Sequence, residues 1–401
     1  MNASLRSNFV DLKVGVVGFG LRSGLYKHAH RPAQGSVVAM VCDTSERGRA
    51  DAAAKLPEAV ITADLDELLN AGLDAVLVLT PDNQHALVAK RTLEAGIATF
   101  CEKPLDVTLD AVDELLETAF SSGTRLYVGQ NMRHMPVIRQ MREIIESGAI
   151  GTVKAVWCRH FVGNGGDYYF KDWHAERKNT TSLLLQKGAH DIDVIHWLAG
   201  GYTESVAALG DLAVYGAVES RRDNTDRRMG DWFSLENWPP AAQQDLNPII
   251  DVEDISMMQM KLDNGVLASY QQCHFTPDYW RNYTVIGTAG RLENFGDDAG
   301  NIIKVWNTRS QDGYVDADIE VEIEAVDGGH GGADPRLIAE FLRFVQTGGP
   351  TDTWPVAARA AVAAGVLATE SLRTDGSARS VPPLRAELLA YFAANQERVN
   401  A

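Results

Sequence analysis

Val14-Gly15-Val16-Val17-Gly18-Phe19-Gly20-Leu21-Arg22-Ser23-Gly24 is the stretch of sequence that decides the fold. It places Gly-x-Gly-x-x-Ser between an apolar run and a segment with helical spacing. Gly18 permits a tight turn, Gly20 lets the backbone approach a pyrophosphate, and the small Ser23 permits close contact between helix and strand. We therefore expect a dinucleotide-binding turn, with the phosphates at a helix N-terminus, where free N–H groups favour anions.

An acidic residue follows at the distance that this turn requires. Asp43 ends the second apolar run and lies 23 residues after Gly20. A carboxylate at this point accepts the ribose hydroxyls of NAD and repels the 2′-phosphate of NADP. Arg22, Arg47 and Arg49 are nearby cations that could hold a phosphate instead. The sequence predicts NAD as the cofactor, with NADP less favoured.

The order of apolar patterns predicts two domains. Apolar runs alternate with helix-like segments from residue 12 to residue 128, which is typical of a parallel, doubly wound sheet. After Gly148, strand-like runs follow one another with few helices between them. We expect an α/β Rossmann domain at residues 11–130. A second, α+β domain at residues 131–390 is expected to contain an open, mostly antiparallel sheet and the C-terminal helices.

Three longer segments of the second domain are informative. Residues 182–198 have the spacing of one helix, and residues 335–370 have that of helices interrupted at residues 348–350. Residues 217–252 are polar and aperiodic, and loops of this length inside compact domains are often functional.

Composition narrows the class of protein. The 401 residues are 45% hydrophobic and 23% charged, with a net charge of -17. Such an acidic chain repels nucleic acid and anionic membranes. It has no apolar run near the ~18 residues of a membrane span and no signal-like N-terminus. Four dispersed cysteines without metal-ligand spacing indicate buried, reduced thiols (Cys42, Cys101, Cys158 and Cys273). We expect a cytoplasmic protein without a metal, nucleic-acid or membrane partner.

Five further motifs follow strands or begin helices along the chain. They are Thr80-Pro81-Asp82-Asn83-Gln84-His85, Glu102-Lys103-Pro104-Leu105, Gly129-Gln130-Asn131-Met132-Arg133, Gly188-Ala189-His190-Asp191-Ile192-Asp193 and Gly332-Ala333-Asp334-Pro335. Together with the glycine turn they resemble the glucose–fructose oxidoreductase / inositol dehydrogenase / MocA (Gfo/Idh/MocA) oxidoreductase family over almost the whole chain. The most specific of them is Glu-Lys-Pro.

The resemblance implies an NAD(P)-dependent oxidoreductase that acts on a small-molecule carbohydrate. It also implies a homo-oligomer, a dimer or a tetramer, because the open sheet of the family often makes subunit contacts. The expected cofactor-binding residues are Gly18, Phe19, Gly20, Leu21, Arg22, Ser23, Asp43, Thr80, Pro81, His85, Glu102, Lys103 and Asn131. Thr80 and Pro81 are expected on the adenosine and ribose side, whereas His85 either contacts the nicotinamide end or caps a helix.

Lys103 is the first catalytic candidate. Pro104 holds it out of a helix, and the bound nicotinamide cation would lower its pKa and ease proton transfer. The alternative is a surface lysine paired with Glu102.

His190 is the second catalytic candidate, because hydride removal from an alcohol also requires a proton acceptor. The family pattern is usually Asp-x-x-x-His, but this chain has Gln186 in place of the aspartate. Gln186 could bind a substrate hydroxyl, and Lys187 could supply a second cation, so both are included as catalytic candidates. Asp193, one turn after His190, is interpreted as structural.

An aromatic and basic segment suggests the substrate pocket. Aromatic faces with polar groups suit a sugar ring, and a cluster of cations in an acidic protein suggests an anionic substituent on the substrate. The alternative is a solvated loop whose cations are balanced by Asp172 and Glu176. A second aromatic loop, residues 274–281, could close over the pocket or fill a subunit interface. The substrate candidates are Tyr168, Lys171, Trp173, His174, Arg177, Lys178 and, from the second loop, Tyr279.

Three functions are compatible with these residues. The leading hypothesis is an NAD-dependent dehydrogenase acting on a secondary hydroxyl of a sugar, sugar acid or cyclitol. The second is a redox-neutral, NAD-dependent glycosidase acting on an anionic glycoside such as a sulfoquinovoside, which the exchange at Gln186 favours. The third is a dinucleotide sensor, which an intact Glu102-Lys103-Pro104 disfavours because a sensor needs no proton carrier.

Overall fold

The computed structural model describes residues 11–397, and its first layer is a six-stranded parallel sheet, called sheet A here. Its strands are β1 (Leu12–Val17), β2 (Ser36–Cys42), β3 (Val60–Thr62), β4 (Ala75–Val78), β5 (Ala98–Cys101) and β6 (Leu126–Val128), in the order β3-β2-β1-β4-β5-β6. The strand order reverses between β1 and β4, and ligands of such sheets bind beyond the carboxyl ends of the strands at that point. The predicted Rossmann fold is confirmed.

Local sequence explains the helices around sheet A. For example, α5 (Leu109–Ser122) begins where Thr108 accepts a hydrogen bond from the Ala111 N–H, and it ends at left-handed Gly123. After the glycine turn, the expected helix is only the 3-10 turn η1 (Leu21–Leu25) followed by the single turn α1 (Tyr26–Ala29). The other helical elements of this region are α2 (Glu46–Lys55), α3 (Leu65–Leu69), η2 (Asp82–Gln84), α4 (His85–Glu94), η3 (Asn131–His134) and α6 (Pro136–Glu146).

The second layer is a nine-stranded sheet, called sheet B here, in the order β14-β13-β12-β11-β7-β10-β9-β8-β15. All neighbouring strands are antiparallel except β7 and β10. Burial alternates along β9, as the period-2 pattern predicts for a sheet with one covered face. The strands are β7 (Val153–Phe161), β8 (Thr203–Asp211), β9 (Ile255–Leu262), β10 (Leu267–Cys273), β11 (Trp280–Gly287), β12 (Arg291–Phe295), β13 (Ile302–Trp306), β14 (Ile319–Glu322) and β15 (Arg379–Ser380).

The helix expected at residues 182–198 is two helices in the structure. α9 (Leu183–Gln186) ends before Lys187, and α10 (Gly188–Ala199) starts after it. A side chain at Gly188 would meet the ring of Tyr270 at 2.9 Å, so glycine lets α10 approach sheet B closely. The shorter helical elements before α9 are α7 (Gly165–Tyr169), η4 (Trp173–Ala175) and α8 (Arg177–Thr180).

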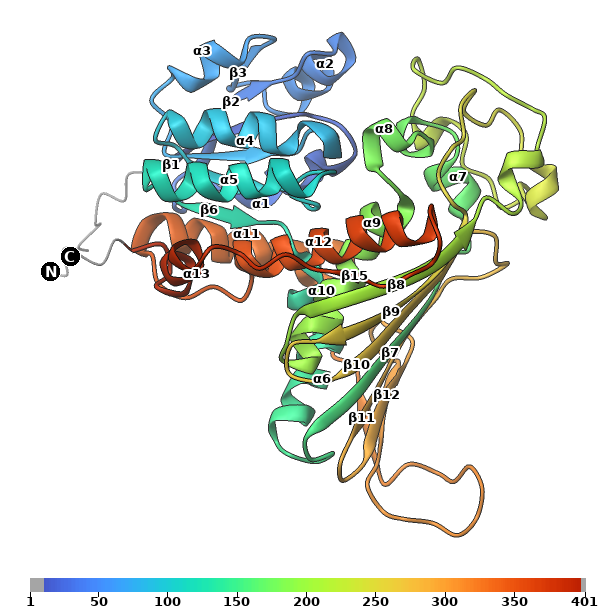
Figure 1. Cartoon of the computed structure of the whole chain (residues 1–401). Coiled ribbons are helices and arrows are strands. Elements are labelled where there is room, and N and C mark those ends of the chain that lie inside the picture. Colours follow the sequence, from blue (N-terminus) through green and yellow to red (C-terminus); the bar gives the residue numbers. More distant parts are fainter. Residues whose placement is uncertain (1–10, 398–401) are drawn as a thin grey trace, which may run out of the picture.

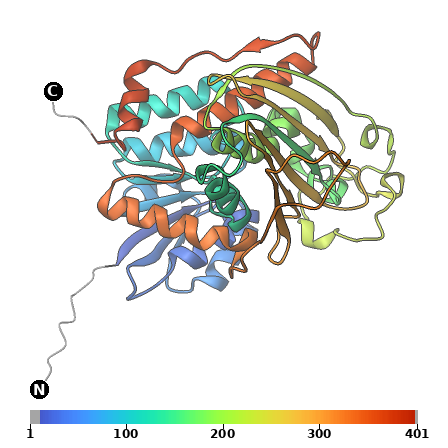
Figure 2. The ribbon, with the colours of Figure 1, turned by 90° about the horizontal axis from the view of Figure 1, so that it is seen from below.

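The C-terminal helices α11 (Gly329–Thr347), α12 (Pro355–Leu372) and α13 (Ala386–Ala393) return to the first layer. Phe341 and Phe344 of α11 pack into the same apolar cluster as β1 and β4, and α13 packs with α5. Figure 1 shows α11, in orange, below the teal strand β6, and Figure 2 shows the same helix from below, in front of the blue ribbons of the Rossmann domain. The division of the chain at residue 130 stays a prediction, because these helices complete the packing of sheet A.

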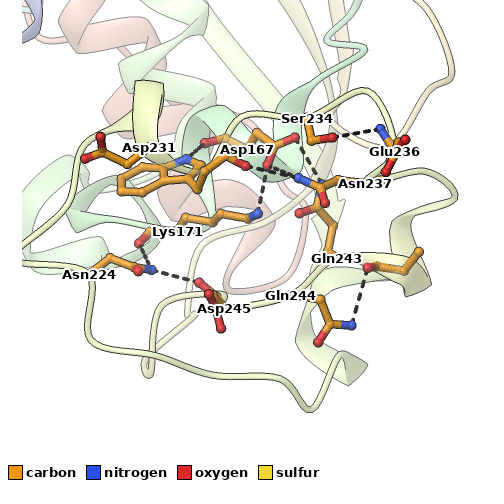
Figure 3. A network of polar contacts seen from close by, with 12 residues as sticks. Asp167, Lys171, Asn224, Asp231, Ser234, Glu236, Asn237, Gln243, Gln244 and Asp245 are labelled. Carbon is orange, nitrogen blue, oxygen red and sulfur yellow. Dashed lines mark hydrogen bonds and ion pairs between the residues drawn. The ribbon is translucent and has the colours of Figure 1, made fainter.

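The long polar segment between β8 and β9 is pinned to the rest of the protein. Its only regular pieces among the described residues are η5 (Tyr215–Ala217), η6 (Met229–Asp231) and η7 (Pro240–Ala242). The Nζ of Lys171 lies 2.8 Å from Asp167 beneath the segment, and Asn237 donates to the same aspartate (Figure 3). Arg228 pairs with Asp51 on α2, so the segment also contacts the Rossmann domain.

Among residues 11–397, no helix is both long and apolar enough to cross a membrane. The four cysteines are free thiols in the structure, as predicted. Cys42, Cys101 and Cys158 are buried, and Cys273 is half-buried.

Candidate functional site

A cavity of about 570 Å³ opens at the carboxyl ends of sheet A, where the strand order reverses. Loops after β1, β2, β4 and β5 form most of its wall, and η4 and α9 close it from the second domain. The predicted site residues that line it are Gly18, Phe19, Gly20, Leu21, Arg22, Asp43, Thr80, Pro81, His85, Glu102, Lys103, Trp173, His174 and Gln186.

The glycine turn has the geometry that a dinucleotide needs. Gly18 has a φ of 89°, and a Cβ there would lie 2.7 Å from the carbonyl oxygen of Leu79. A Cβ at Gly20 would meet nothing within 4 Å, which leaves that face of the backbone open toward a ligand. Only glycine therefore fits the first position, and the second presents bare backbone to the cavity.

Asp43 is held by the same turn. Its Oδ2 accepts a hydrogen bond of 2.6 Å from the Phe19 N–H, and its Oδ1 accepts bonds of 2.7 Å from the N–H and the hydroxyl of Ser45. These three bonds fix the orientation of the carboxylate on the wall of the cavity. The arrangement suits an acceptor for ribose hydroxyls.

The three arginines that could have favoured NADP are already bonded to protein groups. Arg22 donates to Glu102 at 2.7 Å and to Asp334 at 3.1 Å. The other two bind groups near α2: Arg49 donates to the carbonyls of Asp43 and Thr44 at 2.9 Å, and Arg47 lies 3.6 Å from Asp231. Since each guanidinium has protein partners, Asp43 dominates this end of the cavity.

Lys103 is not a surface lysine paired with Glu102. The Glu102 carboxylate binds Arg22 and the backbone N–H of Lys103, whereas the Nζ of Lys103 donates to the carbonyl of Gln186 at 3.1 Å. Burial lowers the pKa of Lys103, and Arg22 and Arg281 lower it further, although Asp82 and Glu102 act against this. The lysine thus bridges the two domains at the cavity wall, and the fraction of its neutral form is increased.

The other catalytic candidates lie on the second domain beside Lys103. His190 and Lys103 line a small second cavity of about 10 Å³, whereas Gln186 lines the main cavity. The Nζ of Lys187 lies 6.0 Å from the centre of the Tyr169 ring. Burial lowers the pKa of Lys187 to about 7, with further lowering by Arg281 and Lys103.

His85, Asn131 and Ser23 have structural contacts. The two ring nitrogens of His85 lie 2.6 Å from the carbonyl oxygen of Pro104 and 2.8 Å from that of Thr80. The ring therefore ties two of the motif loops together. Asn131 donates to Asp334 at 3.4 Å, and Ser23 is buried beneath the glycine turn; neither lines the main cavity.

Several buried oxygen atoms of the motif loops and α9 have no hydrogen-bond partner among the described residues: Thr80 Oγ1, Asp82 Oδ2, Gln130 Oε1, Asn131 Oδ1 and Gln186 Oε1. Buried polar groups are normally bonded, so each marks a place for a ligand group or a water. Three of these residues, Thr80, Asp82 and Gln186, line the main cavity. Their oxygen atoms can accept hydrogen bonds from hydroxyl groups such as those of NAD.

The predicted cation cluster does not form a free basic surface, and that part of the sequence analysis is corrected. Lys171 is only 2% exposed and pairs with Asp167, Arg177 lies 3.2 Å from Asp251, and Lys178 lies 2.6 Å from Glu176. The acidic chain supplies a counter-charge to each of these three cations, whereas Lys187, the fourth cation of the predicted cluster, lies near the Tyr169 ring. For Lys178 the alternative interpretation holds, since its charge is balanced by Glu176 two residues before it.

Only some of the aromatic candidates line the main cavity. Trp173 and His174 stack with ring centres 3.7 Å apart, and both line the main cavity. Tyr168 stacks on Phe233 outside the cavity lining. Its neighbour Tyr169 meets the His174 ring at 5.5 Å and is also outside the cavity lining.

Sequence reasoning missed a buried network centred on Asp191. His160 lies 3.0 Å from its Oδ2, Arg281 lies 3.1 Å from its Oδ1, and Tyr283 donates to the same Oδ1. Burial would raise the pKa of Asp191, but Arg281 and His160 hold it well below its usual range. The network anchors α10, and with it Lys187 and His190, to β7 and β11.

The motif His190-Asp191-Ile192-Asp193 was the only sequence signal for this network, because the partners of Asp191 are far away along the chain. Asp193 has a separate role: it makes two hydrogen bonds, of 2.7 and 2.6 Å, with buried Arg133. Directly before β11, at the end of the strand that carries Arg281, the hydroxyl of Tyr279 donates to Asp297 at 2.5 Å.

Comparison with known proteins agrees with this geometry. Residues 12–130 match the oxidoreductase family with an NAD-binding Rossmann fold, and residues 138–293 match the GFO/IDH/MocA C-terminal domain. The putative oxidoreductase YteT of Bacillus subtilis is 26% identical over 69% of this chain and 74% of its own length. Inositol 2-dehydrogenase 2 of Saccharopolyspora erythraea is 31% identical over 48% of this chain, a match that spans 55% of the relative.

Solved structures show the same fold. Levoglucosan dehydrogenase in complex with NADH and L-sorbose has a TM-score of 0.76 at 19% identity, covering 94% of this chain and 100% of that one. GenD2 from gentamicin A biosynthesis, in complex with NAD, has a TM-score of 0.70 at 20% identity, covering 96% and 100%. At these identities the likeness concerns the fold alone.

Proposed function

The chain belongs to the Gfo/Idh/MocA oxidoreductase family, and from that premise we propose that it is a dehydrogenase that oxidises a secondary hydroxyl of a sugar, sugar acid or cyclitol with NAD. The observation that carries the proposal is the position of Lys103. Its side chain lines the dinucleotide cavity and bonds across to the second domain, where a substrate would meet the cofactor. Relatives named inositol 2-dehydrogenase and a neighbour crystallised with levoglucosan support a substrate of the carbohydrate type.

NAD, when bound, supplies the acceptor for a hydride from the carbon that carries the hydroxyl group. The hydroxyl proton must leave to a base, and Lys103 has the lowered pKa that this role needs. The carbonyl of Gln186 orients its Nζ, and His190, which lines the small adjoining cavity together with Lys103, is the proposed next acceptor of that proton. The unpartnered Oε1 of Gln186 accepts a hydrogen bond from a substrate hydroxyl, a role that needs no charge.

The cofactor preference rests on Asp43, whose carboxylate is fixed by three hydrogen bonds, while Arg49 donates to backbone carbonyls and Arg47 pairs with Asp231. A 2′-phosphate would meet this negative charge. We therefore expect NAD to bind more tightly than NADP.

The test is to incubate the protein with NAD and, separately, myo-inositol, levoglucosan, glucuronate and an aryl sulfoquinovoside, while recording the absorbance of NADH and of the released aryl alcohol. Net NADH from one of the first three supports the dehydrogenase. Release of the aryl alcohol without net NADH would instead support the redox-neutral glycosidase that the exchange at Gln186 favours. If none of the four compounds gives either product, the proposed substrate class is rejected.

We further expect a homo-oligomer, a dimer or a tetramer, that acts on its small-molecule substrate in the cytoplasm. Light scattering of the purified protein measures the oligomeric state directly.

A further inference from the structure

Asp82 is a buried carboxylate in the wall of the main cavity. It is the first residue of η2, directly beyond the end of β4, and is 5% exposed. Its Oδ2 has no hydrogen-bond partner among the described residues. Sequence analysis quoted Asp82 within the motif after β4 but gave it no role.

An unpartnered carboxylate is unfavourable inside a protein, because a charge removed from water needs hydrogen bonds or a counter-charge. Asp106, from the next motif along the chain, is buried to the same degree at 6% exposed. Its carboxylate, however, accepts hydrogen bonds from the N–H groups of Val107, Thr108 and Ala86, at 2.7, 3.3 and 3.3 Å. The protein therefore satisfies one buried aspartate of this region and leaves the other facing the cavity.

The surroundings place Asp82 at the reaction end of the cavity. The next residue, Asn83, donates to Asn179 at 3.2 Å, which sets η2 against α8 of the second domain. The charged and titratable groups that act on Asp82 are His85 on α4, Glu102 and Lys103 after β5, and His174 on η4. Burial raises the pKa of Asp82, while His85, Lys103 and His174 act against this.

The position that usually supplies a carboxylate in this family holds neutral Gln186 here, on the same cavity wall. We propose that Asp82 is a carboxylate of the reaction centre that contacts the ligand directly. Its free oxygen accepts a hydrogen bond from a hydroxyl group, either of the ribose next to the nicotinamide or of the carbohydrate. The inference rests on the proposed function only for the second of these two sources.

The test is the Asp82→Asn variant, which keeps the shape of the side chain and removes its charge. Without ligand, the variant should melt at the same temperature as the wild type or higher, because an unpartnered buried charge is lost. Its affinity for the hydroxyl-bearing ligand should fall about 10- to 100-fold, as expected for one charge-assisted hydrogen bond. A residue with a structural role alone would show the opposite result, lower stability with unchanged affinity.

Asp106→Asn is the matched control, since this aspartate is equally buried but bonded outside the cavity, and the amide nitrogen that replaces one of its oxygens cannot accept a backbone N–H. It should lower the melting temperature of the ligand-free protein and leave the affinity for NAD unchanged.

Two measurements distinguish the source of the hydroxyl group. Calorimetric titration of Asp82→Asn with NAD alone shows the lower affinity if the ribose hydroxyl is the donor. If the affinity for NAD is unchanged, the loss should appear in the KM of the sugar that the wild type oxidises. Failure of every sugar with the wild type rejects the proposed function, and the NAD titration and the melting temperatures then decide on Asp82 without it. The inference is overturned if Asp82→Asn melts lower without ligand, or if it changes neither the NAD affinity nor any measurable KM.

Discussion

The two ends of the main cavity differ in how far the protein satisfies its own polar groups. At the adenosine end, Asp43 accepts three hydrogen bonds and Arg49 donates to two carbonyls. At the reaction end, Asp82 and Gln186 each have a buried oxygen without a partner among residues 11–397. At the adenosine end the protein satisfies the hydrogen bonds of these groups itself, whereas at the reaction end buried oxygen atoms remain that can bond to a ligand.

This difference has a physical consequence for binding and catalysis. Groups that are already oriented lose little freedom when a ligand binds, so the adenosine end favours affinity and the choice between NAD and NADP. Buried groups without partners gain hydrogen bonds only when a ligand arrives, so the reaction end favours discrimination between ligands. Substitutions at the reaction end should therefore change turnover or the binding of the hydroxyl group that Asp82 accepts, and those at the adenosine end should change the affinity and choice of cofactor.

The largest effect is expected at Lys103. Lys103→Met keeps the apolar stem and removes the proton acceptor, so kcat should fall by about 10²-fold or more. The affinity for NAD should stay close to that of the wild type, because the adenosine end is untouched. Steady-state kinetics and NAD titration of both proteins test this. Activity within a few-fold of wild type would mean that the reaction end does not depend on Lys103.

An intermediate effect is expected at the other end. Asp43→Ala removes the ribose acceptor and the bonds to Phe19 and Ser45, so the affinity for NAD should fall about tenfold. The difference between the affinities for NAD and NADP should become smaller, because the charge that repels a 2′-phosphate is gone. Titration of both proteins with both cofactors measures this difference. If the wild type binds NADP as tightly as it binds NAD, the adenosine end does not discriminate in the way proposed.

The smallest effect is expected outside both ends, at the predicted cation cluster. Arg177→Gln breaks an exposed ion pair with Asp251, and such pairs contribute little. KM values for glucuronate and for its uncharged parent glucose should both stay within about twofold of wild type. A large rise in KM for glucuronate but not for glucose would instead identify Arg177 as an anion-binding residue. The substrate site would then include α8.

The sequence alone was sufficient to locate those residues whose position depends only on a short segment of chain at the end of a strand. The turn at Gly18 and Gly20, the carboxylate of Asp43 and the position of Lys103 after β5 all follow from local spacing and from the rule that parallel strands end at one edge. The pairing of Lys171 was also within reach, because Asp167 precedes it by four residues. The ring partners of Tyr168 and Tyr169, which are Phe233 and His174, were not, because tertiary packing brings these rings together.

The tertiary structure decided which charges are compensated. Arg22 meets Asp334, and Asp191 meets Arg281, across separations in sequence that no local pattern encodes. The same holds for the carboxylate of Asp82, which is buried because η2 packs against α8 of the second domain, and which has no partner among the described residues for its Oδ2. The chain's own sequence determined where a dinucleotide lies, since backbone turns are local. Which side chains remain to meet the ligand depended on long-range packing, since hydrogen bonding and burial are properties of neighbours in space.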